Sequence, residues 1–149
     1  MTLDEQDEAL SGMQDYTRLV VWQRARALTV AVHEATRRSP ESTAPGLRSQ
    51  LLRAVMSIGA NIAEGASRET RADFARFIVM AIASASEAEH HLTVCSDLGV
   101  LDQPVAAHLA AQTTAVRQTL LGLRRALIMR VQEREVVFGM MATDPTLLH

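Results

Sequence analysis

The residues of this sequence that most directly suggest chemistry are Glu87 and His90. The spacing Glu-x-x-His places both side chains on one face of a helix, and di-iron carboxylate bundles use it to bind metal. Such a site needs two of these units and a further glutamate from each of two other helices, whereas this chain contains the unit once. One histidine with one or two carboxylates does not close a metal cage. We therefore expect no metal and no cofactor, and a carboxylate-metal enzyme is a lesser alternative.

Other catalytic arrangements are also poorly supported. Glu87 and Glu89 are two residues apart and point to different helix faces, whereas paired acid/base catalysis needs two converging carboxylates. Ser57 and Ser84 have no histidine and acid partners in an arrangement that indicates a catalytic triad. The chain has no lysine and therefore no phosphate-binding loop of the glycine-lysine type. We expect a protein that is not an enzyme and has no catalytic residue.

A polar stripe runs along the helix that is predicted around residue 57. Its residues follow offsets of four, four and three, beside an apolar stripe with the same repeat. We interpret it as a register or interface lock, within one chain or between chains, in which Arg53 pairs with Glu87. A contact with a ligand or nucleic acid is the alternative. The residues assigned to this site are Arg53, Ser57, Asn61, Glu64, Arg68, Ser84 and Glu87.

A second candidate surface is a basic stripe on the last predicted helix, opposed only by Glu133 and Glu135. Such a stripe is usually a solvated face. Repeated around an oligomer, however, it could hold a phosphate backbone. The possible nucleic-acid contacts are Arg117, Arg124, Arg125, Arg130 and Arg134.

Composition and charge place limits on the class of protein. Residues 1–15 contain five carboxylates and no base, so the chain changes from −5 in this acidic, flexible arm to +3 in the remainder. All 15 basic residues are arginine, which indicates either a GC-rich genome or selection for phosphate binding. The single Cys95 excludes an intramolecular disulfide. The sequence shows no secretory signal and no apolar run of about 20 residues, so we expect a cytoplasmic protein without a membrane partner.

Apolar periodicity predicts four helices, at about residues 20–37, 47–64, 71–98 and 104–135. Gly65 is expected to end the second helix in a left-handed conformation, and Thr70 to cap the third. In the third helix, a heptad seam runs through Phe74, Ile78, Ala81, Ala85, Ala88, Leu92 and Cys95. Short loops between long helices predict an all-α, antiparallel up-down-up-down four-helix bundle over residues 16–135. Residues 136–149, with Gly139 and Pro145, are expected to form a frayed tail.

Residues 53–68, RAVMSIGANIAEGASR, resemble the RAxxSIxxNIAEGxxR signature of the bacterial four helix bundle protein family, also called 23S rRNA intervening-sequence proteins. Residues 19–25, LVVWQRA, are similar to the LxVWQKA opening of that family, and residues 84–89 to its SxxExE segment. Gly59 and Ala83 depart from the pattern, which often has proline and glycine at these positions. The resemblance implies a homopentameric ring with a central channel and, less directly, a link to structured RNA.

The sequence therefore favours a non-enzymatic, oligomeric four-helix bundle that acts as an interaction module. Its expected partners are further copies of itself and structured RNA. The alternative is a protein adaptor or accessory subunit for a nucleic-acid-processing enzyme such as a reverse transcriptase.

Overall fold

The computed structural model describes residues 15–40 and 43–143. Its elements are a short 3-10 helix, η1 (Tyr16–Arg18), and the α-helices α2 (Val20–Thr36), α3 (Leu47–Ala66), α4 (Arg71–Asp97) and α5 (Gln103–Thr143). The described residues contain no β-strand, so the prediction of an all-α protein with four main helices is confirmed. Within the same residues, none of the helices combines the length and the hydrophobicity that crossing a bilayer requires.

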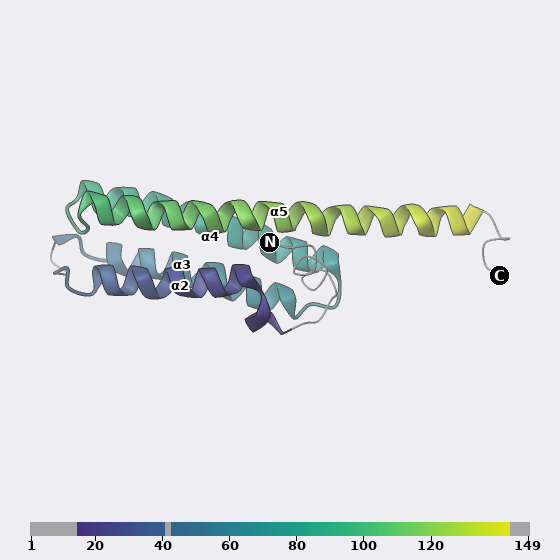
Figure 1. The fold of residues 1–149 in the computed structure, drawn as a ribbon, viewed down its shortest axis with the longest axis horizontal. Coiled ribbons are helices and arrows are strands. Elements are labelled where there is room, and N and C mark those ends of the chain that lie inside the picture. Colours follow the sequence, from purple (N-terminus) through teal and green to yellow (C-terminus); the bar gives the residue numbers. More distant parts are fainter. Residues whose placement is uncertain (1–14, 41–42, 144–149) are drawn as a thin grey trace.

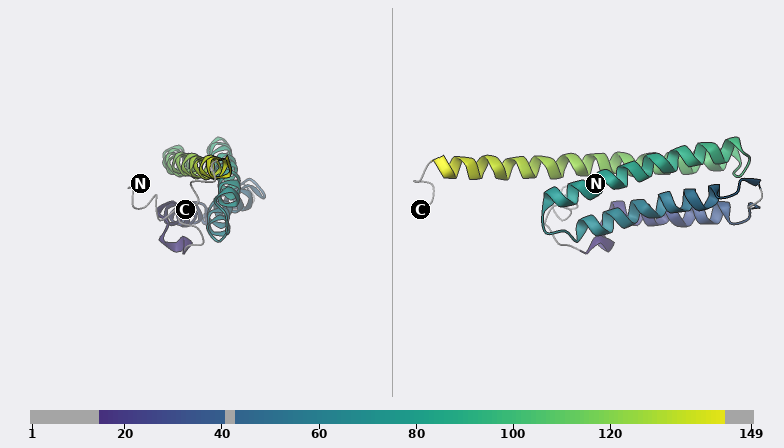
Figure 2. Two further views of the ribbon diagram at one scale, coloured as in Figure 1. Left: turned by 90° about the vertical axis from the view of Figure 1, so that its right-hand side faces the viewer. Right: turned by 180° about the vertical axis from the view of Figure 1, so that it is seen from behind.

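The chain reverses direction at each of the three connections between the main helices (Figure 1). Helix α4 packs extensively against both α3 and α5, whereas α2 makes smaller contacts with α3 and α5. The two further views agree with this arrangement, in which α4 lies beside α3 on one side and α5 on the other (Figure 2). Helix α4 is therefore the central element of the bundle.

The predicted heptad seam of α4 forms the middle of the core. All seven of its residues, from Phe74 to Cys95, are buried and at most 4% exposed. They pack in one cluster with Leu28 and Val32 of α2, with Ile58 of α3 and with apolar residues of α5. The Cys95 thiol is fully buried, and burial raises its pKa. Because the thiolate is the reactive form, Cys95 serves as a packing residue.

The start and the end of α4 are set by local hydrogen bonds. The Thr70 hydroxyl accepts a bond from the backbone N–H of Asp73 at 3.1 Å, as predicted for an N-cap. At the other end, Gly99 has φ +71°, and the N–H groups of Gly99 and Val100 donate to the carbonyls of Ser96 and Cys95. This pair of bonds is the Schellman arrangement, which turns the chain sharply towards α5.

The predicted role of Gly65 is wrong. Helix α3 continues through Gly65 to Ala66, and the described glycines with positive φ are Gly46 and Gly99. The reason for glycine is instead the close approach of α4. A Cβ atom at position 65 would lie 2.8 Å from Phe74 Cδ2 and 2.8 Å from Phe77 Cβ.

The predicted end of the last helix at Glu135 is also wrong, because α5 continues to Thr143. A single Gly139 costs a helix only about 1 kcal/mol and does not break it. Figure 1 shows that this end of α5 projects past the connection between α3 and α4. The last fully buried residue of α5 is Leu127, and the residues from 132 to 142 are exposed.

Most of the acidic arm, residues 1–14, lies outside the described residues. Asp15 caps η1, where its carboxylate accepts bonds from the hydroxyl and the backbone N–H of Thr17 at 2.6 and 3.0 Å. These bonds, together with the nearby Arg18 charge, lower the pKa of Asp15. Residues 144–149 of the predicted tail also lie outside the described residues.

Candidate interaction surfaces

The structure brings three residues of the polar stripe together between α3 and α4. The hydroxyls of Ser57 and Ser84 are 2.8 Å apart and partly buried. The Asn61 amide donates to the backbone carbonyl of Ser57 at 2.9 Å and to its hydroxyl at 3.1 Å. Because partly buried polar groups are costly without partners, this network favours the alignment of Ser57 with Ser84.

The remaining residues of the stripe lie on the surface and do not join this network. The Glu87 carboxylate is 3.2 Å from His91 Nε2 on its own helix. Arg53 is exposed, and the predicted Arg53–Glu87 pair does not form within the described residues. Both side chains are exposed to water, so an ion pair between them would add little stability. A role of Arg53 between subunits is still a prediction.

Near the end of α3, Arg68 forms a salt bridge with Glu64, with 2.6 Å between Arg68 Nη2 and Glu64 Oε1. The guanidinium of Arg68 also lies over the Phe77 ring, 4.7 Å from its centre. A cation above an aromatic face is attracted to the ring. Arg68 therefore contacts both the end of α3, through Glu64, and α4, through Phe77.

Sequence reasoning missed a polar contact between α4 and α5. Glu89 Oε1 accepts bonds from the Thr114 hydroxyl at 2.8 Å and from Arg117 Nε at 3.1 Å. About a quarter of the Glu89 and Arg117 side chains is exposed, at 25% and 28%. The signal was the tight turn at Gly99, which sets the pairing of the two helices. Arg117 is thus an intrachain partner of Glu89, and its assignment as a nucleic-acid contact stays a prediction.

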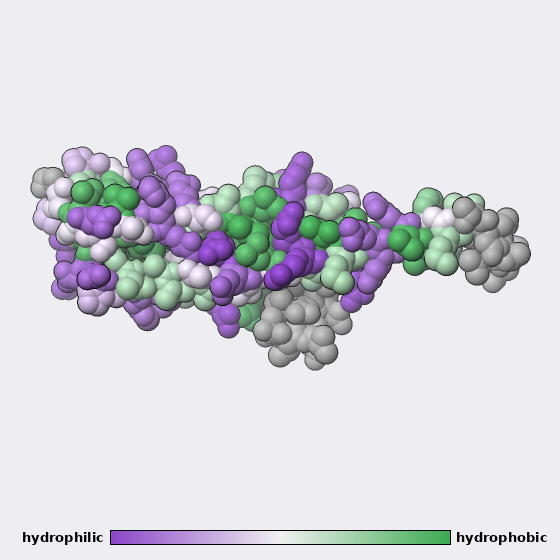
Figure 3. All heavy atoms as spheres, turned by 90° about the horizontal axis from the view of Figure 1, so that it is seen from above, coloured by the Kyte–Doolittle hydropathy of each residue, from purple (hydrophilic) through white to green (hydrophobic). Residues whose placement is uncertain are grey.

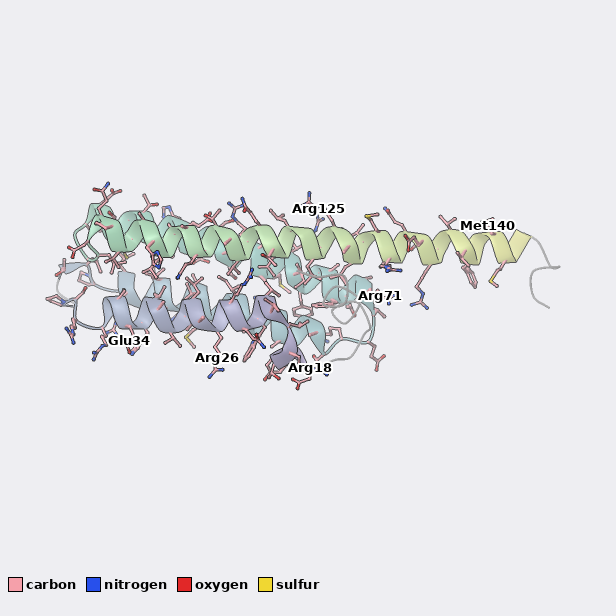
Figure 4. All side chains as sticks on the ribbon, viewed as in Figure 1. Arg18, Arg26, Glu34, Arg71, Arg125 and Met140 are labelled. Carbon is pink, nitrogen blue, oxygen red and sulfur yellow. The ribbon has the colours of Figure 1, made fainter. Side chains whose placement is uncertain are left out.

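The other arginines of α5 do not share one face. Arg124 and Arg125 are consecutive and point about 100° apart. Figure 4 shows Arg125 on the side of α5 that faces away from the other helices. Arg124 Nε is buried and has no hydrogen-bond partner among the described residues, and Arg130 Nη1 lies 3.8 Å from Glu133 Oε2. Arg134 is exposed and lines a shallow groove with Glu133, Val137, Phe138 and Met141.

The described residues contain no group of three or more histidines, cysteines or acids that could hold a metal ion. His90 does not contact Glu87 as the Glu-x-x-His spacing suggested. The centre of its ring instead lies 5.4 Å from that of His91. The histidine that contacts the Glu87 carboxylate is His91. The candidate features within the described residues are therefore the polar network between α3 and α4 and the arginines of α5.

The four main helices place the chain in the broad class of all-α helical bundles. A family model described as 23S rRNA-intervening sequence protein matches residues 17–122, which is more than two thirds of the chain. The chain therefore belongs to the 23S rRNA-intervening sequence protein family.

A similar fold occurs in a solved structure. It is described as a protein with unknown function from the S23 ribosomal protein family of Bacteroides thetaiotaomicron VPI-5482. The two chains are 24% identical with a TM-score of 0.66, and the match covers 70% of this chain and 98% of that chain. The search of curated proteins found no match. The family model ends at residue 122, so it does not include the projecting end of α5.

Proposed function

We propose that this protein is a non-enzymatic interaction module whose antiparallel up-down-up-down bundles assemble into a homopentameric ring. The observation that carries the proposal is the outward face of α4, opposite its buried seam. Ala72, Val79, Ala83 and Ser86 share this face, and all four are exposed. Their spacing repeats the heptad pattern of the seam, and small side chains let another helix approach closely.

The α4 face fits a helix of a second copy better than it fits water. Val79 is 44% exposed and Met80 beside it is 41% exposed, in the middle of the central helix. Two sides of α4 are already covered by α3 and α5. Burial of this third side against a neighbouring subunit would remove apolar surface from water, which stabilises an assembly by about 25 cal/mol per Å².

The test is the mass of the purified full-length chain in solution. We expect light scattering at micromolar concentration to give about 82 kDa, the mass of five chains of 16.3 kDa each. A mass of 16.3 kDa, that of the single chain, would overturn the proposal. A stable assembly of another size would contradict the ring of five but support self-association.

Structured RNA is the second candidate partner, and the specific observation is the charge of the last helix. Residues 103–143 contain five arginines and two glutamates. Arg125 faces outward, and Arg134 is also exposed. A ring would bring several copies of this charge together, and the summed field would attract a phosphate backbone.

We predict that deleting residues 1–15, which changes the formal charge of the chain from −2 to +3, strengthens binding of structured RNA in a gel shift. In the deleted chain, Arg124→Gln with Arg125→Gln should weaken binding roughly 3- to 10-fold for unrelated sequences alike, because backbone contacts are not sequence-specific. The matched control is Arg37→Gln with Arg38→Gln, another consecutive pair, at the end of α2.

Failure of the deleted chain to shift RNA at low salt would exclude this partner. The adaptor role would then be the better candidate, with the apolar end of α5 as its binding surface. Figure 3 shows hydrophobic side chains gathered at this projecting end, beyond a band of hydrophilic ones.

A further inference from the structure

A groove on the outer side of α2 and α3 shares no residue with the outward face of α4 or with the α5 arginine surface. Its volume is about 530 Å³, within the range of roughly 300–1,000 Å³ that is usual for small-molecule sites. One lining residue, His33, comes from α2, and the others come from successive turns of α3. The lining residues are His33, Arg48, Ser49, Leu52, Arg53 and Met56.

Among the described residues, no carboxylate pairs with the arginines of this groove. Arg48 Nε donates to the Thr36 hydroxyl at 3.4 Å, which places its guanidinium at the groove. The side chains of Arg53 and His33 are exposed, and neither has a hydrogen-bond or ion-pair partner among the described residues. Glu34, which follows His33 in the sequence, forms a salt bridge with Arg37, with 2.9 Å between Glu34 Oε2 and Arg37 Nε.

The net positive charge around the groove also favours the binding of an anion. The described residues between 20 and 63, which exclude 41–42, contain six arginines and one glutamate. None of the residues that line the groove is acidic. Unneutralised guanidinium groups at a concave surface attract anions, and their paired N–H donors match the geometry of phosphate oxygens.

The other side of the groove is apolar. Leu52 is half-buried, and Met56 is 60% exposed in spite of its apolar side chain. Methionine is flexible and makes favourable contacts with aromatic rings. A ligand that fits both sides has a phosphate at one end and a planar, weakly polar group at the other.

We propose that the α2–α3 groove binds a phosphate monoester with an aromatic body, such as a nucleoside monophosphate. Arg48 and Arg53 bind the phosphate, His33 and Ser49 donate further hydrogen bonds, and Leu52 with Met56 contacts the aromatic group. The site shares no residue with the α4 face.

The test is calorimetric titration of the full-length chain with 5′-AMP and with adenosine, which lacks the phosphate. We expect adenosine to bind at least tenfold more weakly than 5′-AMP. Arg48→Gln with Arg53→Gln should weaken 5′-AMP at least tenfold. Met56→Gln should weaken 5′-AMP but leave the affinity for inorganic phosphate unchanged.

The control variant is Arg24→Gln with Arg38→Gln, which removes the same charge from exposed positions outside the groove. It should change the affinity for 5′-AMP less than twofold, and circular dichroism should show equal helicity in all variants. Equal weakening by both arginine pairs would mean diffuse attraction and overturn the site, as would failure of 5′-AMP to bind. Displacement of 5′-AMP by an oligoribonucleotide without terminal phosphates would overturn the assignment to a monoester. Light scattering on the same samples reports the assembly separately.

Discussion

Replacing Gly65 by alanine should destabilise the bundle, although alanine favours a helix more than glycine does. The added Cβ would lie 2.8 Å from Phe77 Cβ, an atom next to the α4 backbone that cannot move aside by rotation of the side chain. Helices α3 and α4 would have to separate at this point. Overpacking of this kind costs on the order of 1–3 kcal/mol. For a chain of this size we expect the Tm of Gly65→Ala to fall by about 3–10 °C.

Gly59 provides the matched control on the same helix. A Cβ at position 59 would meet Trp22 Nε1 at 3.8 Å and Ala25 Cβ at 4.0 Å, which are ordinary contacts. Gly59→Ala should therefore leave stability unchanged or increase it by up to about 1 kcal/mol. Thermal unfolding of both variants should be compared at one protein concentration, because assembly makes Tm concentration-dependent. A Gly65→Ala Tm equal to that of Gly59→Ala would show that the α3–α4 contact is not tight.

Placing carboxylates on the outward face of α4 should convert the proposed assembly into single chains. In Val79→Glu with Ala83→Glu, both substituted positions are exposed in the bundle, so the fold of each chain should persist. Between subunits the same charges would be buried without partners, at a cost of roughly several kcal/mol per ion. We expect light scattering to give 16.3 kDa for this variant, with helicity unchanged by circular dichroism.

The control for this variant is Val30→Glu with Ala111→Glu, which changes the same two residue types at exposed positions on α2 and α5. It should retain the mass of the unmodified assembly. Loss of assembly in the control as well would attribute the effect to net charge. Retention of assembly in the α4 variant would exclude this face as the contact between subunits.

The elements that could be predicted from the sequence were those with a strong local signal. The seam of α4 and the Thr70 cap depend on spacing within one segment, and both are present in the structure. The role of Gly65 could not be predicted in this way. A glycine in a sequence can indicate either a left-handed turn or a close contact between helices. At Gly65 the positions of Phe74 and Phe77 show that the close contact is the reason.

Features that depend on the alignment of two helices were harder to predict. The Arg53–Glu87 pair was inferred from an approximate register, but the structure aligns Ser57 with Ser84 and leaves Arg53 outside this contact. The pairing of Arg117 with Glu89 depends on how tightly the chain turns at Gly99. The α2–α3 groove combines His33 with residues of a different helix, and no short motif marks such a combination.

The unbroken course of α5 has a mechanical consequence. Sixteen residues follow Leu127, the last buried residue, before the helix ends at Thr143, and at 1.5 Å per residue they extend about 24 Å. A helix of this length acts as a lever arm whose fulcrum is the edge of the bundle. A tilt of about 10° at the fulcrum moves the tip by about 4 Å, roughly the thickness of one layer of side chains. Figure 4 shows Met140 near this tip. A small rotation of the bundle would therefore displace any partner bound there.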